Sequence, residues 1–122
     1  INNMNEFTIG QLMDMVRKFC EVRDWDQYHN PKDLAIGIST EANELLDIFR
    51  FKSEKEMREM FQNKQIKEHI EDEIADTFFF LLRFAQMNHL DLGKCMTDKL
   101  EKNNIKYPVE KIKGKNLKYT EI

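Results

Sequence analysis

Four acidic residues stand in two pairs with the same internal spacing, Glu41 with Glu44 and Glu73 with Asp76. Residues three positions apart lie on one face of a helix, with Cβ atoms about 5–6 Å apart. Two neighbouring helices that each carry one pair can bring the four carboxylates to one point. Carboxylates held so close repel one another and need a cation to neutralise them. The spacing therefore makes a metal site the first hypothesis.

The residues around these pairs favour a metal site over a solvated acidic surface. Glu73 and Asp76 are followed almost at once by an apolar run from Phe78 to Leu82, and apolar residues also flank the first pair. Acidic side chains among apolar residues need a reason, whereas those on an exposed helix face need none. The plainer alternative is two acidic faces in solvent, because 22 of the 122 residues are acidic and such pairs also arise by chance.

The residue types available around the acids narrow the choice of metal. Ligation by oxygen alone favours Mg²⁺, Mn²⁺ or Ca²⁺ over zinc or copper. A di-iron bundle needs Glu-x-x-His pairs, and none of His29, His69 and His89 has a glutamate three residues before it. The two cysteines form no C-x-x-C motif, so zinc and redox chemistry are not indicated. Asp47 extends the first acidic row and is either a further ligand or a neighbour.

Helices have to carry the two acidic pairs, and the apolar periodicity predicts four main helices and one short one. Thr8 with Gln11 and Ser53 with Glu56 form capping boxes that open two of them, and Asp91 is the N-cap expected for the last. The predicted helices cover about residues 9–23, 32–50, 54–61, 64–87 and 92–104. Strand patterns are almost absent, so we expect an all-α fold built as an antiparallel helix bundle.

The length of 122 residues fits a single domain, with the main bundle at about residues 8–107 and a basic, irregular tail at about 108–122. Helical chains this short often complete their core by oligomerising, so we expect a homo-oligomer. From Lys94 to Ile122 eight lysines face four acids. An acidic body with a basic end can hold a metal at one place and phosphate at another, although solvated lysines explain the tail equally well.

Several classes of protein are not indicated by the composition. No apolar run is long enough for a membrane span, no signal peptide is visible, and two free cysteines fit a cytoplasmic protein. The basic tail lacks the interleaved aromatic residues of nucleic-acid-binding modules, so we expect no nucleic acid partner. Because the chain begins with Ile1, Met4 is expected to be the natural start.

Taken together, these motifs resemble the MazG-like nucleotide pyrophosphohydrolases of the all-α NTP pyrophosphatase superfamily, in their dCTP pyrophosphatase-like branch. The two acidic pairs, with 28 residues between them, match the family signature in order. Two departures stand out, since Thr40 replaces the usual second acid and Phe51 replaces a tryptophan. The other matching segments are Arg23–Pro31 (R-D-W-x-x-[FY]-H-x-P), Phe49–Lys52 (F-x-W-K), Lys99–Asn103 with Lys106–Pro108 (K-x-x-x-N…[RK]-Y-P), and Lys118–Glu121.

The resemblance implies an activity and a cofactor. We expect Mg²⁺-dependent hydrolysis of a nucleoside triphosphate, dCTP or a related or modified dNTP, to the monophosphate and pyrophosphate, in house-cleaning of the nucleotide pool. Glu41, Glu44, Glu73 and Asp76 would bind Mg²⁺, or Mn²⁺ in its place, and Glu41 or Glu44 would take the proton of the attacking water. The family also implies a dimer, or a tetramer built from two dimers, with sites shared between chains.

The resemblance further implies contacts to the rest of the nucleotide. We expect the base between aromatic side chains, and phosphate or sugar contacts from a basic helix. The candidate residues are Trp25, His29 and Phe51 for the base, and Lys99, Asn103, Lys106 and Tyr107 for phosphate and sugar. The plainer alternatives are core packing for the two aromatic residues, a loop hydrogen bond for the histidine, and an ordinary helix end with solvated lysines. Phe80 is expected to pack in the core rather than line the pocket.

Two other functions stay open on the sequence. The first is a broader dNTP pyrophosphatase that accepts dATP as well as dCTP, because Phe51 changes the size of the base pocket relative to tryptophan. The second is a non-catalytic helical module that binds Mg²⁺ or a basic partner. Assaying each dNTP for release of pyrophosphate separates all three, since a binding module releases none.

Overall fold

The computed structural model describes residues 6–122, so Met4 lies outside the described part of the chain. Residues 6–122 contain helices and no strand, which confirms the all-α prediction. None of these helices is long and apolar enough to cross a membrane. The helices are α1 (Ile9–Glu21), α2 (Pro31–Phe49), α3 (Glu54–Met60), α4 (Lys64–Met87), α5 (Leu92–Lys106) and α6 (Val109–Ile112), with 3-10 turns η1 (Asp26–Tyr28) and η2 (Tyr119–Glu121).

The helices begin where the sequence provides side-chain caps. The Thr8 hydroxyl accepts a hydrogen bond from the Gln11 amide at 3.1 Å, and the Gln11 side chain accepts one from the Thr8 amide at 2.8 Å. Ser53 and Glu56 form the same reciprocal pair at the start of α3. These bonds satisfy amide groups that have no partner inside the helix. Both predicted capping boxes are confirmed, as is the Asp91 cap of α5.

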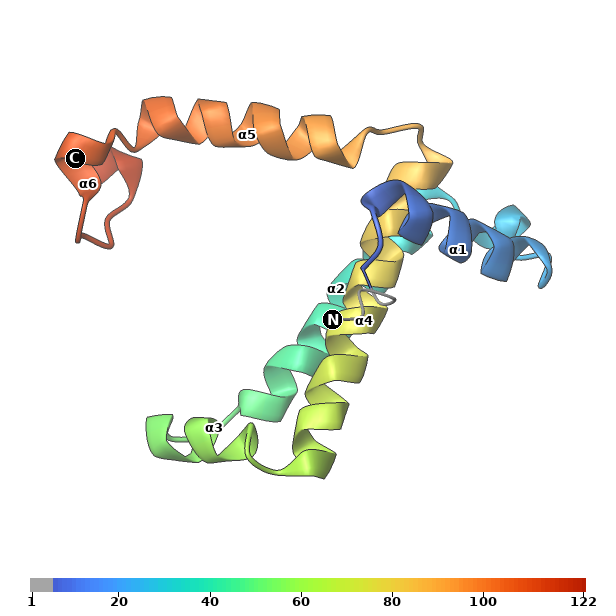
Figure 1. Cartoon of the computed structure of the whole chain (residues 1–122), viewed down its shortest axis with the longest axis horizontal. Helices are drawn as coiled ribbons and strands as arrows, with labels where there is room; N and C mark the ends of the chain where they lie inside the picture. The colour runs from blue at the N-terminus through green and yellow to red at the C-terminus, as the bar shows by residue number, and fades with distance from the viewer. Residues whose placement is uncertain (1–5) are drawn as a thin grey trace. The chain divides into compact units, whose positions relative to one another are not determined.

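Contacts divide the chain into two compact units, the first ending at His89 and the second beginning at Leu90. In the first unit α2 and α4 run antiparallel and side by side, and α3 connects the end of α2 to the start of α4 (Figure 1). Helix α1 packs against α4. The antiparallel pair therefore places the acidic face of α2 opposite the acidic face of α4.

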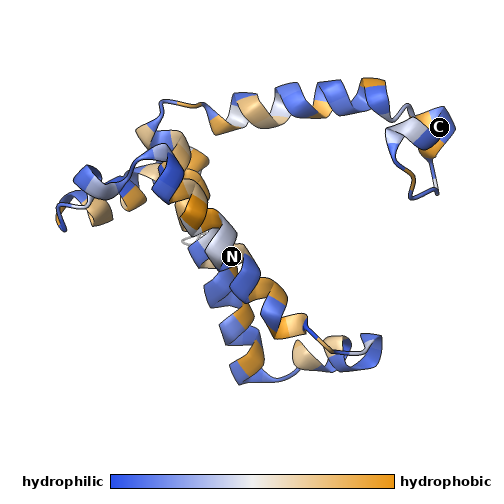
Figure 2. Cartoon of the chain, turned by 180° about the vertical axis from the view of Figure 1, so that it is seen from behind, coloured by the Kyte–Doolittle hydropathy of each residue, from blue (hydrophilic) through white to orange (hydrophobic). Residues whose placement is uncertain are grey.

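The hydrophobic core of the first unit is small. Hydrophobic residues concentrate on the half of the α2 and α4 pair that lies near α1 (Figure 2). Several hydrophobic residues along both helices nevertheless face solvent. Leu46 is 65% exposed, and Ile36, Ile74 and Leu81 are also exposed. The buried hydrophobic side chains of the described residues are Cys20, Leu34, Met60, Ile70, Leu82 and Ala85.

The second unit contains α5, α6 and η2. The Tyr107 amide donates to the Asn103 carbonyl at 2.8 Å and closes α5. Pro108 then serves as the N-cap of α6, where the sequence led us to expect irregular chain. Proline suits the start of a helix because its fixed φ is already helical and its missing N–H has no partner there. The ring of Tyr107 meets that of Tyr119 edge to face, with centroids 6.4 Å apart, which ties the end of the chain to α5.

Candidate active site

Three of the four predicted ligands converge between α2 and α4. One carboxylate oxygen each of Glu41, Glu73 and Asp76 lies within 4.8 Å of the others. Because the helices run antiparallel, a step toward the end of α2 matches a step toward the start of α4. Glu41 therefore faces Asp76 on the opposite helix, and the second pair follows one turn further. This geometry is what the i, i+3 spacing on two helices predicts.

The cluster is partly withdrawn from water and carries unpaired oxygens. Glu73 is only 8% exposed. Burial, with the neighbouring acids, raises the pKa of Glu41 to about 7. Burial raises the pKa of Glu73 as well. Among the described residues, Oε2 of Glu41 and Oε2 of Glu73 are the buried side-chain oxygens that lack a hydrogen-bond partner. A buried oxygen without a partner is costly, so a cation fits these three carboxylates.

Other polar residues surround the three ligands without joining them. Glu44 is exposed, yet its carboxylate lies close enough to raise the pKa of both Glu41 and Glu73. His69 Nε2 lies 3.5 Å from Glu73 Oε1. Asp47 pairs instead with Arg50, at 3.8 Å between Oδ1 and Nη1. The structure thus separates an inner group of three acids from Glu44 at its edge.

An aromatic groove of about 550 Å³ opens beside the acids. Its walls come from α1, the segment before η1, α2 and α4, and two of the metal-site acids form one side. The lining residues are Met15, Val16, Phe19, Trp25, Glu41, Asp76, Phe79 and Phe80. A groove that combines carboxylates with aromatic faces suits a ligand that has a charged end and a flat apolar end.

Four aromatic rings of this groove contact one another in a chain. Phe19 meets Trp25 edge to face with centroids 5.7 Å apart, and it meets Phe79 at 5.9 Å. Phe79 in turn meets Phe80 at 5.4 Å. Edge-to-face pairs at these distances are favourable, which fixes the orientation of each ring. Phe19 and Phe79 were not among the site residues predicted from the sequence, although the run of three phenylalanines after Thr77 was a signal that could have revealed Phe79.

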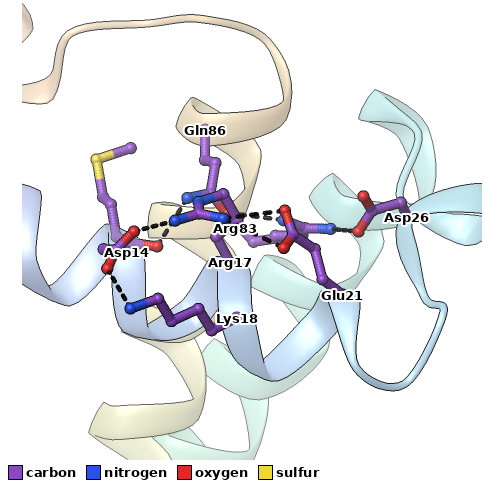
Figure 3. A network of polar contacts seen from close by, with 8 residues as sticks. Asp14, Arg17, Lys18, Glu21, Asp26, Arg83 and Gln86 are labelled. Atoms are coloured by element: carbon purple, nitrogen blue, oxygen red, sulfur yellow. Dashed lines mark hydrogen bonds and ion pairs between the residues drawn. The ribbon is translucent and has the colours of Figure 1, made fainter.

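A buried arginine holds the segment that carries Trp25. Arg83 is 1% exposed, and its Nε donates to Nδ1 of His29 at 2.8 Å while its guanidinium also pairs with Asp26. Its Nη1 donates to Gln86, whose side chain donates to the Met13 carbonyl on α1 at 2.7 Å. Figure 3 shows Arg83 with Asp26 and Gln86 beside the surface ion pairs of α1. Arg83 therefore links α4 to both α1 and the η1 segment.

The hydrogen bonds of Arg83 also determine the protonation state of His29. Its Nδ1 accepts a hydrogen bond, so the ring is neutral, and burial together with Arg83 lowers its pKa. The ring lies near Trp25, with centroids 6.1 Å apart, but it is not among the residues that line the groove. The observed contact of His29 is thus the loop hydrogen bond that the sequence allowed as an alternative.

Phe51 is not among the residues that line the groove, and the candidates near the end of α5 belong to the second unit. Phe51 follows the end of α2, is 88% exposed and has a φ of +63°. Trp25 precedes the start of the same helix, so α2 separates the two residues by roughly 28 Å at 1.5 Å per residue. The second unit contains Lys99, Asn103 and Lys106 on α5 and Tyr107 at the C-cap of that helix. Within this unit Lys106 Nζ lies 4.9 Å from the ring of Tyr119. One chain thus brings Trp25 to the acids without Phe51.

Comparisons with known proteins identify the family of this chain. A profile of the MazG-like family matches residues 36–122. The dCTP pyrophosphatase 1 of Rattus norvegicus is 28% identical over 117 residues, covering 96% of this chain and 69% of the rat protein. The Homo sapiens protein of the same name is 26% identical over 117 residues, with the same two coverages. The crystal structure of a pyrophosphatase from Archaeoglobus fulgidus superimposes with a TM-score of 0.77 at 36% identity, covering 88% of this chain and 98% of that one.

The helical fold, the acidic cluster and these likenesses define the class of protein, which is a nucleoside triphosphate pyrophosphohydrolase. The chain belongs to the MazG-like family, whose profile covers most of its length. The resemblance drawn from the sequence motifs is therefore confirmed. The matched residues include all four acids and begin after Trp25 and His29.

Proposed function

We propose that this enzyme hydrolyses a deoxynucleoside triphosphate, dCTP or a related or modified dNTP, to the monophosphate and pyrophosphate, with Mg²⁺ as its cofactor. The observation that carries the proposal is the convergence of Glu41, Glu73 and Asp76 at one side of an aromatic groove. A dNTP needs a cation for its phosphates and a flat apolar surface for its base. The names of the rat and human relatives support dCTP as the first substrate to test.

The carboxylates have two roles in this proposal. Glu41, Glu73 and Asp76 hold the metal, because their oxygens lie within 4.8 Å of one another and two buried ones have no other partner. Mg²⁺, or Mn²⁺ in its place, neutralises phosphate charge and makes water a better nucleophile at neutral pH. Glu44 stays outside the inner group and faces solvent. We therefore assign proton acceptance from the attacking water to Glu44 rather than Glu41.

The reaction breaks one phosphoric anhydride bond. The water oxygen forms a bond to one of the two phosphorus atoms that flank the oxygen between the first and second phosphates. The bond from that phosphorus to the bridging oxygen breaks, and the bridging oxygen leaves with the other product. The proton of the water passes to Glu44, which lies next to Glu41 and Glu73. The products are the nucleoside monophosphate and pyrophosphate. Positioning and electrostatic stabilisation supply most of the catalysis in such transfers.

In this proposal the base lies beside Trp25 and Phe19, two aromatic residues that line the groove. A base stacked on an aromatic ring gains about 1–3 kcal/mol, and the stacking tolerates any base because each has a π face. His29 helps to position Trp25 indirectly, since its ring accepts a hydrogen bond from Arg83. The structure favours Trp25 as the stacking residue and His29 as part of the support for the loop.

Phe51 contributes to the base pocket only if a second copy of the chain supplies it. Its ring is 88% exposed and lies at the far end of α2 from Trp25. Exposed hydrophobic residues on α2 and α4, such as Leu46 and Ile74, give a second copy an apolar surface to cover. We therefore propose a homo-oligomer, a dimer or tetramer, in which Phe51 and the phosphate-binding candidates Lys99, Asn103, Lys106 and Tyr107 complete sites between chains.

One assay tests the proposed function directly. The protein is incubated with each of the four dNTPs and Mg²⁺, and pyrophosphate and the monophosphate are quantified together. Equal amounts of both products with dCTP are expected. Release of orthophosphate would place the attack at the terminal phosphate and contradict the proposal. Turnover of dATP at a rate similar to dCTP would instead support the broader dNTP pyrophosphatase, and no turnover of any nucleotide would leave a binding module.

A further inference from the structure

The ring of Phe80 occupies the space that any side chain at Gly37 would fill. A Cβ atom built on Gly37 would lie 2.6 Å from Cδ1 and Cε1 of Phe80 and 2.9 Å from its Cγ. Carbon atoms in contact normally lie about 3.5–4.0 Å apart. The Phe80 ring therefore rests against the backbone of α2, an approach that only glycine allows.

This glycine lies in the middle of a helix, where glycine needs an explanation. A glycine inside a helix costs about 1 kcal/mol relative to alanine. Gly10 shows the contrast, because a Cβ there would come no closer than 3.8 Å to the Thr8 hydroxyl. Gly37 is thus the helical glycine whose replacement forces a neighbour to move by more than a few tenths of an ångström, and that neighbour is an aromatic ring of the groove.

The pair lies one helical turn from the metal-binding acids. Gly37 precedes Glu41 by four residues on α2, and Phe80 follows Asp76 by four residues on α4, so each pair shares a helix face. Phe80, Glu41 and Asp76 all line the same groove. One turn rises by about 5.4 Å, so the Phe80 ring lies about that far along the groove from the acids that would hold the phosphates in the proposed function.

We propose that Gly37 and Phe80 together set the depth of the groove and thereby select the size of the nucleobase that the enzyme accepts. Gly37 lets the Phe80 ring sink toward α2, and the space this leaves is the space available to the base. A side chain at Gly37 would fill the space beside α2 and push the Phe80 ring into the groove. A shorter side chain at position 80 would make the groove deeper. This inference rests on the proposed nucleotide hydrolysis and adds a determinant of substrate choice to it.

The test is a cycle of three variants, Gly37→Ala, Phe80→Leu and the double variant. The measured quantity is the ratio of kcat/KM for dATP to kcat/KM for dCTP. We expect Phe80→Leu to raise this ratio and Gly37→Ala to lower it, each by about tenfold, the usual effect of a small change of volume in an apolar pocket. In the double variant the shorter side chain leaves room for the new methyl group, so the ratio returns toward the wild-type value.

Two controls make the cycle specific. Gly10→Ala adds the same methyl group to α1, and Phe84→Leu makes the same change one turn along α4 outside the groove lining. Neither is expected to change the ratio. The inference would be overturned if the ratio stays constant in Gly37→Ala and Phe80→Leu while kcat/KM falls equally for dATP and dCTP. That result would mean that the substitutions push α2 and α4 apart and weaken the metal site for every substrate alike.

A binding measurement separates this inference from the proposed function. Trp25 is the single tryptophan of the chain and lies in the groove, so its fluorescence reports binding of nucleosides without phosphate or metal. We expect Phe80→Leu to improve the affinity for deoxyadenosine relative to deoxycytidine. If the wild type turns over no dNTP, the proposed function fails. If it does and neither the binding ratio nor the kinetic ratio moves, only the role of Gly37 and Phe80 is wrong. If Gly37→Ala does not fold, Phe80→Leu alone decides.

Discussion

Arg83 on α4 donates a hydrogen bond from Nε to Nδ1 of His29 across 54 positions of sequence, at 2.8 Å. This bond joins α4, which carries two of the proposed metal ligands, to the segment that carries Trp25. The same guanidinium pairs with Asp26, so one side chain holds both the first residue of η1 and the residue that follows this turn. The position of the groove wall therefore depends on a residue that does not line the groove.

Replacing Arg83 tests this dependence. We expect Arg83→Ala to lower the free energy of unfolding by about 2–4 kcal/mol, since it removes a buried charge with its hydrogen bonds while the half-exposed Asp26 can be hydrated. Arg83→Lys keeps the charge but loses the planar fork, and it is expected to restore only part of the stability. Urea unfolding followed by Trp25 fluorescence measures both changes. Arg17→Ala, on the exposed face of α1, is the control, with an expected effect below about 1 kcal/mol.

The two proposed roles of the carboxylates separate in a second experiment. Glu73→Gln removes a ligand, so we expect the affinity for Mg²⁺ or Mn²⁺ to fall by at least about 100-fold, together with turnover. Glu44→Gln removes the proposed proton acceptor and is expected to lower kcat by about 10²–10⁴-fold while metal affinity changes little. Calorimetric titration and steady-state kinetics give the two quantities. Equal loss of metal affinity in both variants would make Glu44 a ligand.

The raised pKa of Glu41 predicts how stability depends on pH. Its pKa of about 7 in the folded protein lies above the ordinary value of 4.5, so the folded state binds the proton more tightly than the unfolded state. The contribution of Glu41 protonation to the stability of the folded state is therefore complete below pH 4.5, and it is lost as pH rises through about 7. Without metal, we expect the Tm to fall between pH 5.5 and 8 more in the wild type than in Glu41→Gln, on an order of a few degrees.

Metal binding should show the opposite dependence on pH. The cation displaces the proton from Glu41, so its affinity is expected to rise by up to about tenfold per pH unit below the pKa and to level off above it. Added Mg²⁺ should then remove the loss of Tm on the alkaline side. An affinity independent of pH between 5.5 and 8 would contradict the protonation of Glu41 in the metal-free protein.

The proposed sharing of sites predicts complementation between two defective chains. Phe51→Ala loses a stacking face and Glu73→Ala loses a ligand, so each protein alone is expected to be weakly active or inactive. If one site uses Glu73 of one chain and Phe51 of its partner, unfolding and refolding the two variants together regenerates about a quarter of the sites. Activity of the refolded mixture above both parents is the expected result. No gain, with mixed oligomers present, would place Phe51 outside the site.

Much of the fold and part of the site follow from local sequence signals. Capping boxes and apolar periodicity fixed the helices to within about two residues, because both signals act over a single turn. The convergence of Glu41, Glu73 and Asp76 followed from equal spacing on two helices that had to pair. The α6 helix was wrongly expected to be irregular, because four residues are too few to show any periodicity.

The rest depends on contacts between distant segments, which no local pattern encodes. Arg83 follows the apolar run of α4, and a charge at that position indicates a partner. The sequence does not identify this partner, because His29 lies 54 positions away and contacts Arg83 only in the folded chain. Phe80 was expected in the core, yet it lies in a notch of α2 and lines the groove at the same time. A sequence gives the identity of Gly37 but not the ring that covers it.

The antiparallel register of α2 and α4 also limits how this chain can change in length. Each acidic residue faces its counterpart only while both helices keep their phase, and one inserted residue turns the rest of a helix by about 100°. An insertion between Gly37 and Glu44, or between Glu73 and Phe80, would separate the groove from the metal ligands. The connection through residues 50–63, which includes α3, lies outside these faces. Length variation among related chains should therefore accumulate there, between two acidic motifs whose internal spacing stays constant.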